Sequence, residues 1–293
     1  MDCLLCGSDQ KKIFARVESF GFPLVYYQCE TCGLIFQSRK ESQAANPEFY
    51  RKTYRRIYQA SEEPTPKDLW VQNQRADHFV EMLQKQEKDV PNRILDFGAS
   101  TGVLLKKFQE KFGSEVIGVE PDDAYRAYAT KTGIKMYNSL DGLLEVQNGK
   151  FDLVSLSHVL EHLKNPVGIL KTIKSKLLVE DGLLLIEVPN FYAHDSYEIA
   201  HLACYTPHTL REVLKQSGFD VVLMEKHGIP RSKLLKLYLT VIATPSSDKL
   251  QQSQVHKDAF VGIKRKLSML YRRFLQKLFP HQAWLSIPVI DYE

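Results

Sequence analysis

Residues 93–188 contain apolar segments that constrain the fold more than any other feature of the chain. The segments at 94–96, 116–119, 151–156 and 183–188 lack the apolar and polar alternation of a half-exposed strand, so we expect strands buried on both faces of a parallel sheet. Helical segments at 103–112, 122–132 and 166–178 separate them. This order predicts an α/β, doubly wound, Rossmann-like sheet. A helix at 207–217 and strands at 220–226 and 237–243 follow, and the two strands can close the sheet as an antiparallel pair.

Four of the five cysteines form two pairs of the pattern Cys-x-x-Cys-Gly near the start of the chain. A redox dithiol would need one such pair at the start of a helix in a βαβ unit, and two matched pairs do not fit that arrangement. Four thiolates at this spacing can hold Zn²⁺ tetrahedrally with no open position, and about 40 residues bury too little surface to fold alone. The sequence therefore predicts a structural zinc ribbon at residues 1–40, ligated by Cys3, Cys6, Cys29 and Cys32.

The loop after the first predicted strand of the sheet is rich in small residues and opens a helix. A dinucleotide fingerprint needs glycine at 98, 100 and 103, but the chain has Gly98, Ser100 and Val103, which argues against NAD. Glu120 ends the next strand, where a carboxylate can accept hydrogen bonds from ribose hydroxyls. Asp96 ends the first strand, and its charge would repel a pyrophosphate but attract a sulfonium or ammonium group. The pattern favours S-adenosylmethionine as cofactor.

At about residues 70–245 the chain resembles the class I S-adenosylmethionine-dependent methyltransferases. The matching patterns are Leu95-Asp96-x-Gly98-x-x-x-Gly102, Glu120, Phe151-Asp152-Leu-Val followed by His158-Val-Leu-Glu161-His162-Leu163, and Asp181-Gly182-Leu-Leu-Leu-Ile-Glu187-Val-Pro189-Asn190. The family often has glycine where this chain has Ser100. The resemblance implies that Asp96, Gly98 and Gly102 line the methionine part, Glu120 the ribose, Ser139 and Leu140 the adenine, and that Ser157 and His158 lie beside the sulfonium. We include Ala99, Ser100, Pro121 and Tyr54 among the expected cofactor-binding residues.

The string from His158 to His162 also matches H-x-x-E-H, a zinc-protease motif. Its place directly after a buried strand argues against metal-assisted hydrolysis, and similar strings are common in this methyltransferase group. Methyl transfer mainly requires a positioned nucleophile and, where needed, a base. The candidates are His158, Glu161, His162 and His201, and we expect His201 to act as the base or to bind the acceptor.

The zinc ribbon, the HVLEHL string and a tyrosine-rich helix at Tyr50, Tyr54 and Tyr58 together resemble sugar methyltransferases of polysaccharide and antibiotic pathways. The resemblance implies a sugar, a sugar nucleotide or another small-molecule or glycan precursor as acceptor. One alternative is an rRNA or tRNA methyltransferase with a zinc ribbon. Another is a non-catalytic binding module on a decayed fold. The expected parts of the chain are the ribbon at 1–40, a helical linker or cap at 41–90, the methyltransferase domain at 91–245 and a tail at 246–293.

The formal net charge of +4 is unevenly placed, because residues 256–280 hold seven lysines and arginines against Asp258 alone. Apolar residues recur there at three- and four-residue spacing, which predicts a basic amphipathic helix at 257–279. Its apolar stripe can pack on its own domain or a second subunit, or lie on an anionic membrane; RNA is less favoured because stacking aromatics are few. The sequence lacks a signal-peptide pattern and a membrane-spanning apolar stretch, so we expect a cytoplasmic protein, with peripheral attachment at the inner membrane surface as one option.

Overall fold

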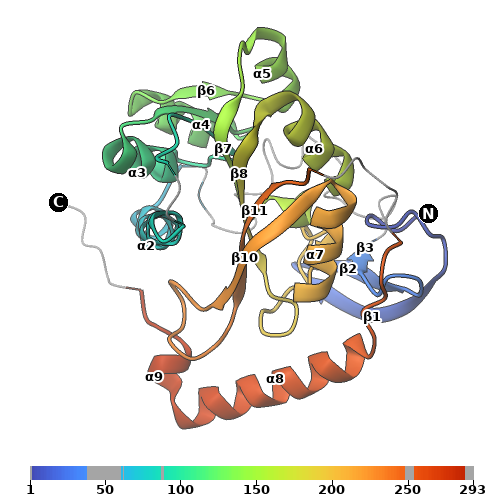
Figure 1. Ribbon diagram of the computed structural model, residues 1–293. Coiled ribbons are helices and arrows are strands. Elements are labelled where there is room, and N and C mark those ends of the chain that lie inside the picture. Colours follow the sequence, from blue (N-terminus) through green and yellow to red (C-terminus); the bar gives the residue numbers. More distant parts are fainter. Residues whose placement is uncertain (1, 38–60, 62, 87–88, 248–253, 288–293) are drawn as a thin grey trace.

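A seven-stranded sheet forms the centre of the protein (Figure 1). The computed structural model describes residues 2–37, 61, 63–86, 89–247 and 254–287. The strands are β4 (Arg93–Phe97), β5 (Glu115–Val119), β6 (Lys135–Tyr137), β7 (Phe151–Ser157), β8 (Leu178–Pro189), β10 (Phe219–His227) and β11 (Tyr238–Pro245). They lie in the order β10-β11-β8-β7-β4-β5-β6, with only β11 antiparallel to its neighbours. The predicted doubly wound α/β fold and the closing antiparallel pair are both confirmed.

Helices cover both faces of this sheet because alternate side chains of each strand point to opposite sides. On one face Ile94, Leu153 and Leu185 pack with two helices, and on the other Leu95 and Val154 pack with three. The first pair is α2 (Pro66–Gln84) and α3 (Val103–Phe112); the second set is α5 (Leu140–Val146), α6 (Pro166–Thr172) and α7 (Pro207–Gln216). Helix α4 (Asp123–Lys131) follows β5, and a π-helical turn η4 (Ile173–Leu177) extends α6. The short β6 and α5 have no predicted counterpart.

The N-terminal cysteine segment forms a second, four-stranded sheet that includes a strand from the α/β region. Its strands are β1 (Lys11–Ser19), β2 (Phe22–Cys29), β3 (Ile35–Gln37) and β9 (Ala203–Cys204). Strand β9 pairs antiparallel with β3, so a segment about 170 residues further along the chain completes the sheet. The N-terminal segment therefore forms part of the same folded unit as the loop between β8 and α7.

Side-chain hydrogen bonds strengthen this junction. The Gln37 amide donates to the backbone carbonyls of Glu198 (2.7 Å) and His201 (2.8 Å). The Tyr26 hydroxyl donates to the Glu198 carbonyl (2.8 Å) and accepts from the Glu198 amide (2.9 Å). Both side chains are buried, where a backbone polar group left without a partner is costly. The N-terminal sheet thus holds the backbone that carries His201.

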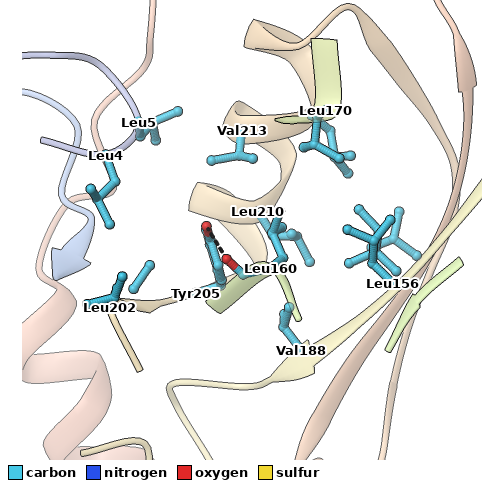
Figure 2. Close-up of a cluster of buried hydrophobic side chains, with 14 of the residues drawn as sticks. Leu4, Leu5, Leu156, Leu160, Leu170, Val188, Leu202, Tyr205, Leu210 and Val213 are labelled. Atoms are coloured by element: carbon cyan, nitrogen blue, oxygen red, sulfur yellow. Dashed lines mark hydrogen bonds between the residues drawn. The ribbon is translucent and has the colours of Figure 1, made fainter. Parts of the chain in front are cut away.

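One continuous apolar core joins the two sheets (Figure 2). Leucines from the first cysteine turn lie close to the loop before α7, which in turn packs on the central sheet. The hydroxyl of buried Tyr205 points toward the Leu160 carbonyl at 3.5 Å. The side chains that mark this core in the figure are Leu4, Leu5, Leu156, Leu160, Leu170, Val188, Leu202, Tyr205, Leu210 and Val213.

The basic tail forms helix α8 (Val261–Leu278), followed by α9 (Pro280–Ala283), and the predicted helix is confirmed. Helix α8 runs along the outside of the body (Figure 1). Asp258, just before it, accepts hydrogen bonds from Thr206 (2.7 Å) and Tyr192 (3.1 Å) and pairs with Lys264, while its backbone amide donates to the Cys32 carbonyl. Within the described part of the chain, no helix is long and apolar enough to span a bilayer.

Candidate active site and metal centre

A pocket of about 630 Å³ opens at the carboxyl ends of β4 and β7. The chain turns in opposite directions from these neighbouring strands, and such a switch point is where open α/β sheets bind ligands. The loop after β4, the end of β5 and the turn after β7 form its floor, and α2 supplies the wall through Asp68, Gln72 and Arg75. The pocket therefore lies where the sequence predicts cofactor binding.

The loop after β4 has a backbone that only small residues accommodate. A Cβ atom on Gly98 would lie 2.3 Å from a methyl carbon of Val159, and its φ of +86° favours glycine. Ser100 has φ 51°, so a serine occupies a left-handed conformation in which glycine is less strained. The Ser100 amide donates to a Glu120 carboxylate oxygen at 2.7 Å, which stabilises this turn.

Two buried carboxylates flank the loop. Asp96 accepts a hydrogen bond from the Ser155 hydroxyl (2.7 Å), and burial, with a smaller contribution from Glu120, raises its pKa to about 7 against the opposing effect of that bond. Glu120 accepts from the backbone amides of Ser100 and Asp122, the latter at 2.9 Å. Two carboxyl groups thus lie at the ends of two adjacent strands, on the same side of the sheet.

The structure brings most of the predicted cofactor residues to this pocket. Its lining includes Asp96, Gly98, Ala99, Ser100, Glu120, Pro121, Ser157 and His158. Gly102 lies one turn further on, where it caps the N-terminus of α3. Ser139 and Leu140, predicted beside the adenine, do not line the pocket: the Ser139 hydroxyl caps α5, and the Leu140 side chain is buried in the apolar core. Tyr54 lies outside the described residues.

His158 lines the pocket between two buried glutamates. Its Nε2 is 3.0 Å from a Glu187 oxygen and its Nδ1 is 3.5 Å from a Glu161 oxygen. Burial and Arg75 act to lower the pKa of His158, but the adjacent carboxylates of Glu161 and Glu187 outweigh them and raise it. The imidazole is therefore held in one orientation with increased basicity.

The H-x-x-E-H segment is not an α-helix. His158 has φ 55°, and only Leu160–His162 form a helical turn, the 3-10 helix η3. The two imidazoles therefore do not lie one α-helical turn apart on one face, as the protease motif requires. His162 lines the pocket, whereas His201 is buried behind it and does not, with the two ring centres 5.1 Å apart.

Several cationic and polar residues of the pocket were not among the predicted site residues. Arg75 and Gln72 come from α2, Lys164 follows η3, and Arg231 lies in the loop between β10 and β11. Arg75 forms an ion pair with buried Glu187. In the sequence, the polar residues of α2 could have indicated part of this set. Only tertiary packing shows that they face the pocket rather than solvent.

The four paired cysteines meet at the end of the N-terminal sheet. Their sulfurs lie within 4.8 Å of one another, with Cys3 and Cys32 at 3.5 Å and Cys6 and Cys29 at 3.6 Å. Sulfurs around tetrahedral Zn²⁺ are about 3.8 Å apart, given Zn–S bonds of about 2.3 Å. All four cysteines are free of disulfides, and three are buried. The donor set therefore fits a structural zinc ion.

A sequence profile of the methyltransferase domain matches residues 69–223. The chain belongs to the methyltransferase domain family. Among curated relatives, the ubiquinone biosynthesis O-methyltransferase of Actinobacillus pleuropneumoniae is 28% identical over 109 residues, which are 33% of this chain and 46% of that protein. An uncharacterized methyltransferase of Staphylococcus carnosus is 32% identical over 120 residues, 37% of this chain and 53% of that protein. The chain thus spans about half the length of these relatives.

Solved methyltransferase structures resemble this chain at low identity. The magnesium protoporphyrin IX methyltransferase of Synechocystis, with bound S-adenosylmethionine, is 16% identical with a TM-score of 0.48, covering 68% of this chain and 95% of that one. An S-adenosylmethionine-dependent methyltransferase of Archaeoglobus fulgidus is 19% identical with a TM-score of 0.49, covering 61% of this chain and 100% of that one.

The cysteine cluster generates a prediction about metal content and stability. We expect Cys29→Ser to lose tightly bound zinc and to lower the midpoint of thermal unfolding, because a three-thiolate site holds zinc less tightly and the ribbon completes the core. Metal analysis and calorimetry on the full chain measure both. The control is Cys204→Ser, which changes a buried cysteine of β9 outside the cluster. Equal zinc content in the two variants would contradict the assignment.

Proposed function

We propose that the protein transfers a methyl group from S-adenosylmethionine to a small acceptor. The observation that carries this proposal is the pair of buried carboxylates, Asp96 and Glu120, on either side of a loop that Gly98 opens to a ligand. A carboxylate at the second strand end suits ribose hydroxyls, and one at the first suits a cationic methionine group. Membership of the methyltransferase domain family supports the same ligand.

The residues of the pocket have separable tasks in this proposal. Glu120 binds the ribose, Asp96 and the Gly98 loop hold the methionine part, and Ser157 and His158 lie at the acceptor side. S-adenosylmethionine supplies a methyl group on a sulfonium centre. His158 Nε2 donates to the Glu187 carboxylate, which leaves the lone pair of Nδ1 as the group that can take a proton from an acceptor hydroxyl. His201 lies behind His162 and acts in this scheme as a positioning residue rather than as the base.

The acceptor that we propose is a sugar carrying a phosphate or nucleotide group. Lys164 and Arg231 line the pocket. Two cationic groups beside a pocket favour an anionic acceptor over a neutral sugar. The resemblance to sugar methyltransferases of polysaccharide pathways agrees with this class, and four free thiols in a zinc cluster suit a reducing, cytoplasmic location.

Phosphates of RNA would meet the same two cationic groups, so an rRNA or tRNA methyltransferase is the second candidate. Phosphate contacts by lysine and arginine make RNA affinity fall steeply with salt. RNA would be favoured as the acceptor by two results together. The affinity for RNA falls as salt is added, and added RNA inhibits the S-adenosylmethionine-dependent methylation of a sugar nucleotide. Methylation of the sugar nucleotide without any RNA affinity would favour the sugar.

The test of the proposed function is the affinity for S-adenosylmethionine. We expect Glu120→Gln to weaken binding about tenfold or more, because the amide keeps the size of the side chain but loses one acceptor and the charge. Isothermal titration calorimetry of the zinc-loaded full chain measures this change. Glu115→Gln is the matched control, since Glu115 lies at the other end of β5 and is exposed.

Absence of S-adenosylmethionine binding by the unmodified protein would contradict the proposal. That result would instead favour the alternative of a decayed methyltransferase fold that acts as a binding module.

Asp96 predicts how the affinity for S-adenosylmethionine depends on pH. Its pKa in the folded protein is about 7, so the ionised form that attracts a cation becomes populated as pH rises through 7. We expect affinity to increase about fivefold to tenfold between about pH 6 and 7.5, and binding to release protons. Calorimetry in buffers of different ionisation enthalpy measures both effects.

The control for this pH dependence is a pair of variants. Asp96→Asn should flatten it, while Asp220→Asn, at the exposed start of β10, should preserve it. Because the pKa of Asp96 is raised in the folded state, its ionisation also lowers the free energy of unfolding as pH rises from about 4 to 7. A pH dependence that persists in Asp96→Asn would rule out this assignment.

A further inference from the structure

Glu161, His162 and His201 converge behind the acceptor side of the pocket. One ligand atom from each of the three lies within 4.8 Å of the others. The first two belong to η3, and the third lies in the loop that the N-terminal sheet holds in place. His162 also lines the pocket, so the cluster borders the space where the acceptor is expected.

Backbone contacts orient both imidazoles of the cluster. His162 Nδ1 is 2.8 Å from the Ala200 carbonyl, and His201 Nδ1 is 3.1 Å from the Ser196 carbonyl. A carbonyl can only accept, so each Nδ1 carries the hydrogen and each neutral ring keeps its lone pair on Nε2. Metal-binding histidines are held by this same kind of outer hydrogen bond.

The carboxylate of Glu161 has no hydrogen-bond donor among the described residues. The residue is 1% exposed, and both of its oxygens are buried without a hydrogen bond. The nearest imidazole nitrogens, on His158 and His162, are 3.5 and 4.0 Å from one oxygen, which is too far for a good hydrogen bond. A buried carboxylate without a hydrogen bond therefore lies beside two imidazoles, and one ligand atom from each of the three lies within 4.8 Å of the others.

We propose that Glu161, His162 and His201 bind a divalent transition-metal ion such as Mn²⁺, Fe²⁺ or Zn²⁺. Two imidazoles and one carboxylate are a common donor set for these ions and leave coordination positions open. Donor atoms around a tetrahedral ion are about 3.3 Å apart, so small side-chain rotations close the site. The role of the ion rests on the proposed function: facing the pocket, it lowers the pKa of an acceptor hydroxyl.

Mn²⁺ is the probe for this site, because thiolates of the cysteine cluster favour softer ions. We expect the zinc-loaded full chain to bind one Mn²⁺ ion in addition to its zinc. Glu161→Gln and His201→Gln should each weaken the affinity for Mn²⁺ about a hundredfold or more. Electron paramagnetic resonance of free Mn²⁺ measures the affinity, and metal analysis confirms that the cysteine zinc remains. His208→Gln, a histidine outside the cluster, is the matched control.

The outcome does not depend on S-adenosylmethionine binding, so a failure of this site and a failure of the proposed function are distinguishable. Circular dichroism shows whether each variant folds. A full chain that binds no Mn²⁺ and only the single zinc ion of the cysteines would overturn the proposal. So would Mn²⁺ binding that both substitutions leave unchanged.

Helix α8 provides a second, independent observation, because it attaches to the body through polar contacts rather than through its apolar stripe. Buried Arg265 donates to the carbonyls of Phe191 and His194, and buried Arg272 donates to the Ala193 carbonyl. Arg272 also pairs with Asp195 at 2.8 Å. The inward face of the helix thus binds the loop after β8.

The apolar stripe of α8 faces away from the body. Its side chains are each 52–73% exposed, although they recur at the spacing of one helix face: Phe260, Ile263, Leu267, Leu270, Tyr271, Phe274 and Leu278. The sequence left open whether this stripe packs on its own domain, and among the described residues it does not. Figure 1 shows the helix along the outer edge of the molecule.

Exposed cations flank the stripe, and α8 contains no acidic residue. Lys266, Arg273 and Lys277 lie along one side of it and Lys264 along the other, as their helical spacing places them. Two copies of this helix would bring like charges together, which disfavours self-association. An outward apolar stripe with cationic edges is typical of a helix that lies in the surface of an anionic membrane.

We infer that α8 binds the protein to anionic lipid, with the stripe at the boundary of headgroups and acyl chains. Sedimentation with vesicles of phosphatidylcholine containing about 30% phosphatidylglycerol tests this, with pure phosphatidylcholine for comparison. We expect binding only to the anionic vesicles, weaker at high salt. The double variant Leu267→Ser with Phe274→Ser should bind at least about tenfold more weakly.

The matched control is Val222→Ser, which removes an exposed apolar side chain from β10. The other possible partner of the stripe is a second copy of the chain. Analytical ultracentrifugation without lipid measures this self-association. The inference fails if the protein does not bind anionic vesicles. It also fails if the stripe variants abolish a dimer while vesicle binding is unchanged.

Discussion

The arrangement of this protein depends on the junction between the N-terminal sheet and the loop after β8. Gln37 and Tyr26 satisfy the backbone groups of residues 198 and 201, and β9 completes the N-terminal sheet. These groups are buried, so losing either side chain would leave polar atoms without partners. A small cysteine-rich segment thereby determines the position of a histidine about 170 residues away. The ribbon thus supports the pocket from behind.

The same loop is held from its other side by the tail. Asp258 receives bonds from Thr206 and Tyr192, and its amide donates to the Cys32 carbonyl, so ribbon, loop and tail meet at one buried carboxylate. Arg265 and Arg272 then clamp residues 191–195. Contact of α8 with a membrane would therefore be adjacent to the loop after β8, which also carries His201.

The charges around His158 show how the fold divides the pocket. Asp96 and Glu120 concentrate negative charge at the cofactor side, where Ser155 and backbone amides satisfy them. Glu187 carries a further negative charge, but Arg75 and His158 surround it. Glu161 is different, since it has ion-pair contacts but no hydrogen-bond donor among the described residues. This contrast distinguishes a satisfied structural carboxylate from one suited to a metal ligand.

Local patterns in the sequence determined the strands and helices of the sheet, the loop at Gly98 and the strand-end acids, because burial on both faces and tight turns restrict residue type over a few positions. Cysteine spacing likewise predicted a cluster whose sulfurs the fold brings together. The places of Arg75 and Arg231 in the pocket wall, and the burial of the predicted His201 behind His162, came only from tertiary structure, since they depend on contacts between distant segments. The direction of the α8 stripe was also decided there: the periodicity shows that an apolar face exists, but the docking of Arg265 and Arg272 on carbonyl groups turned that face outward.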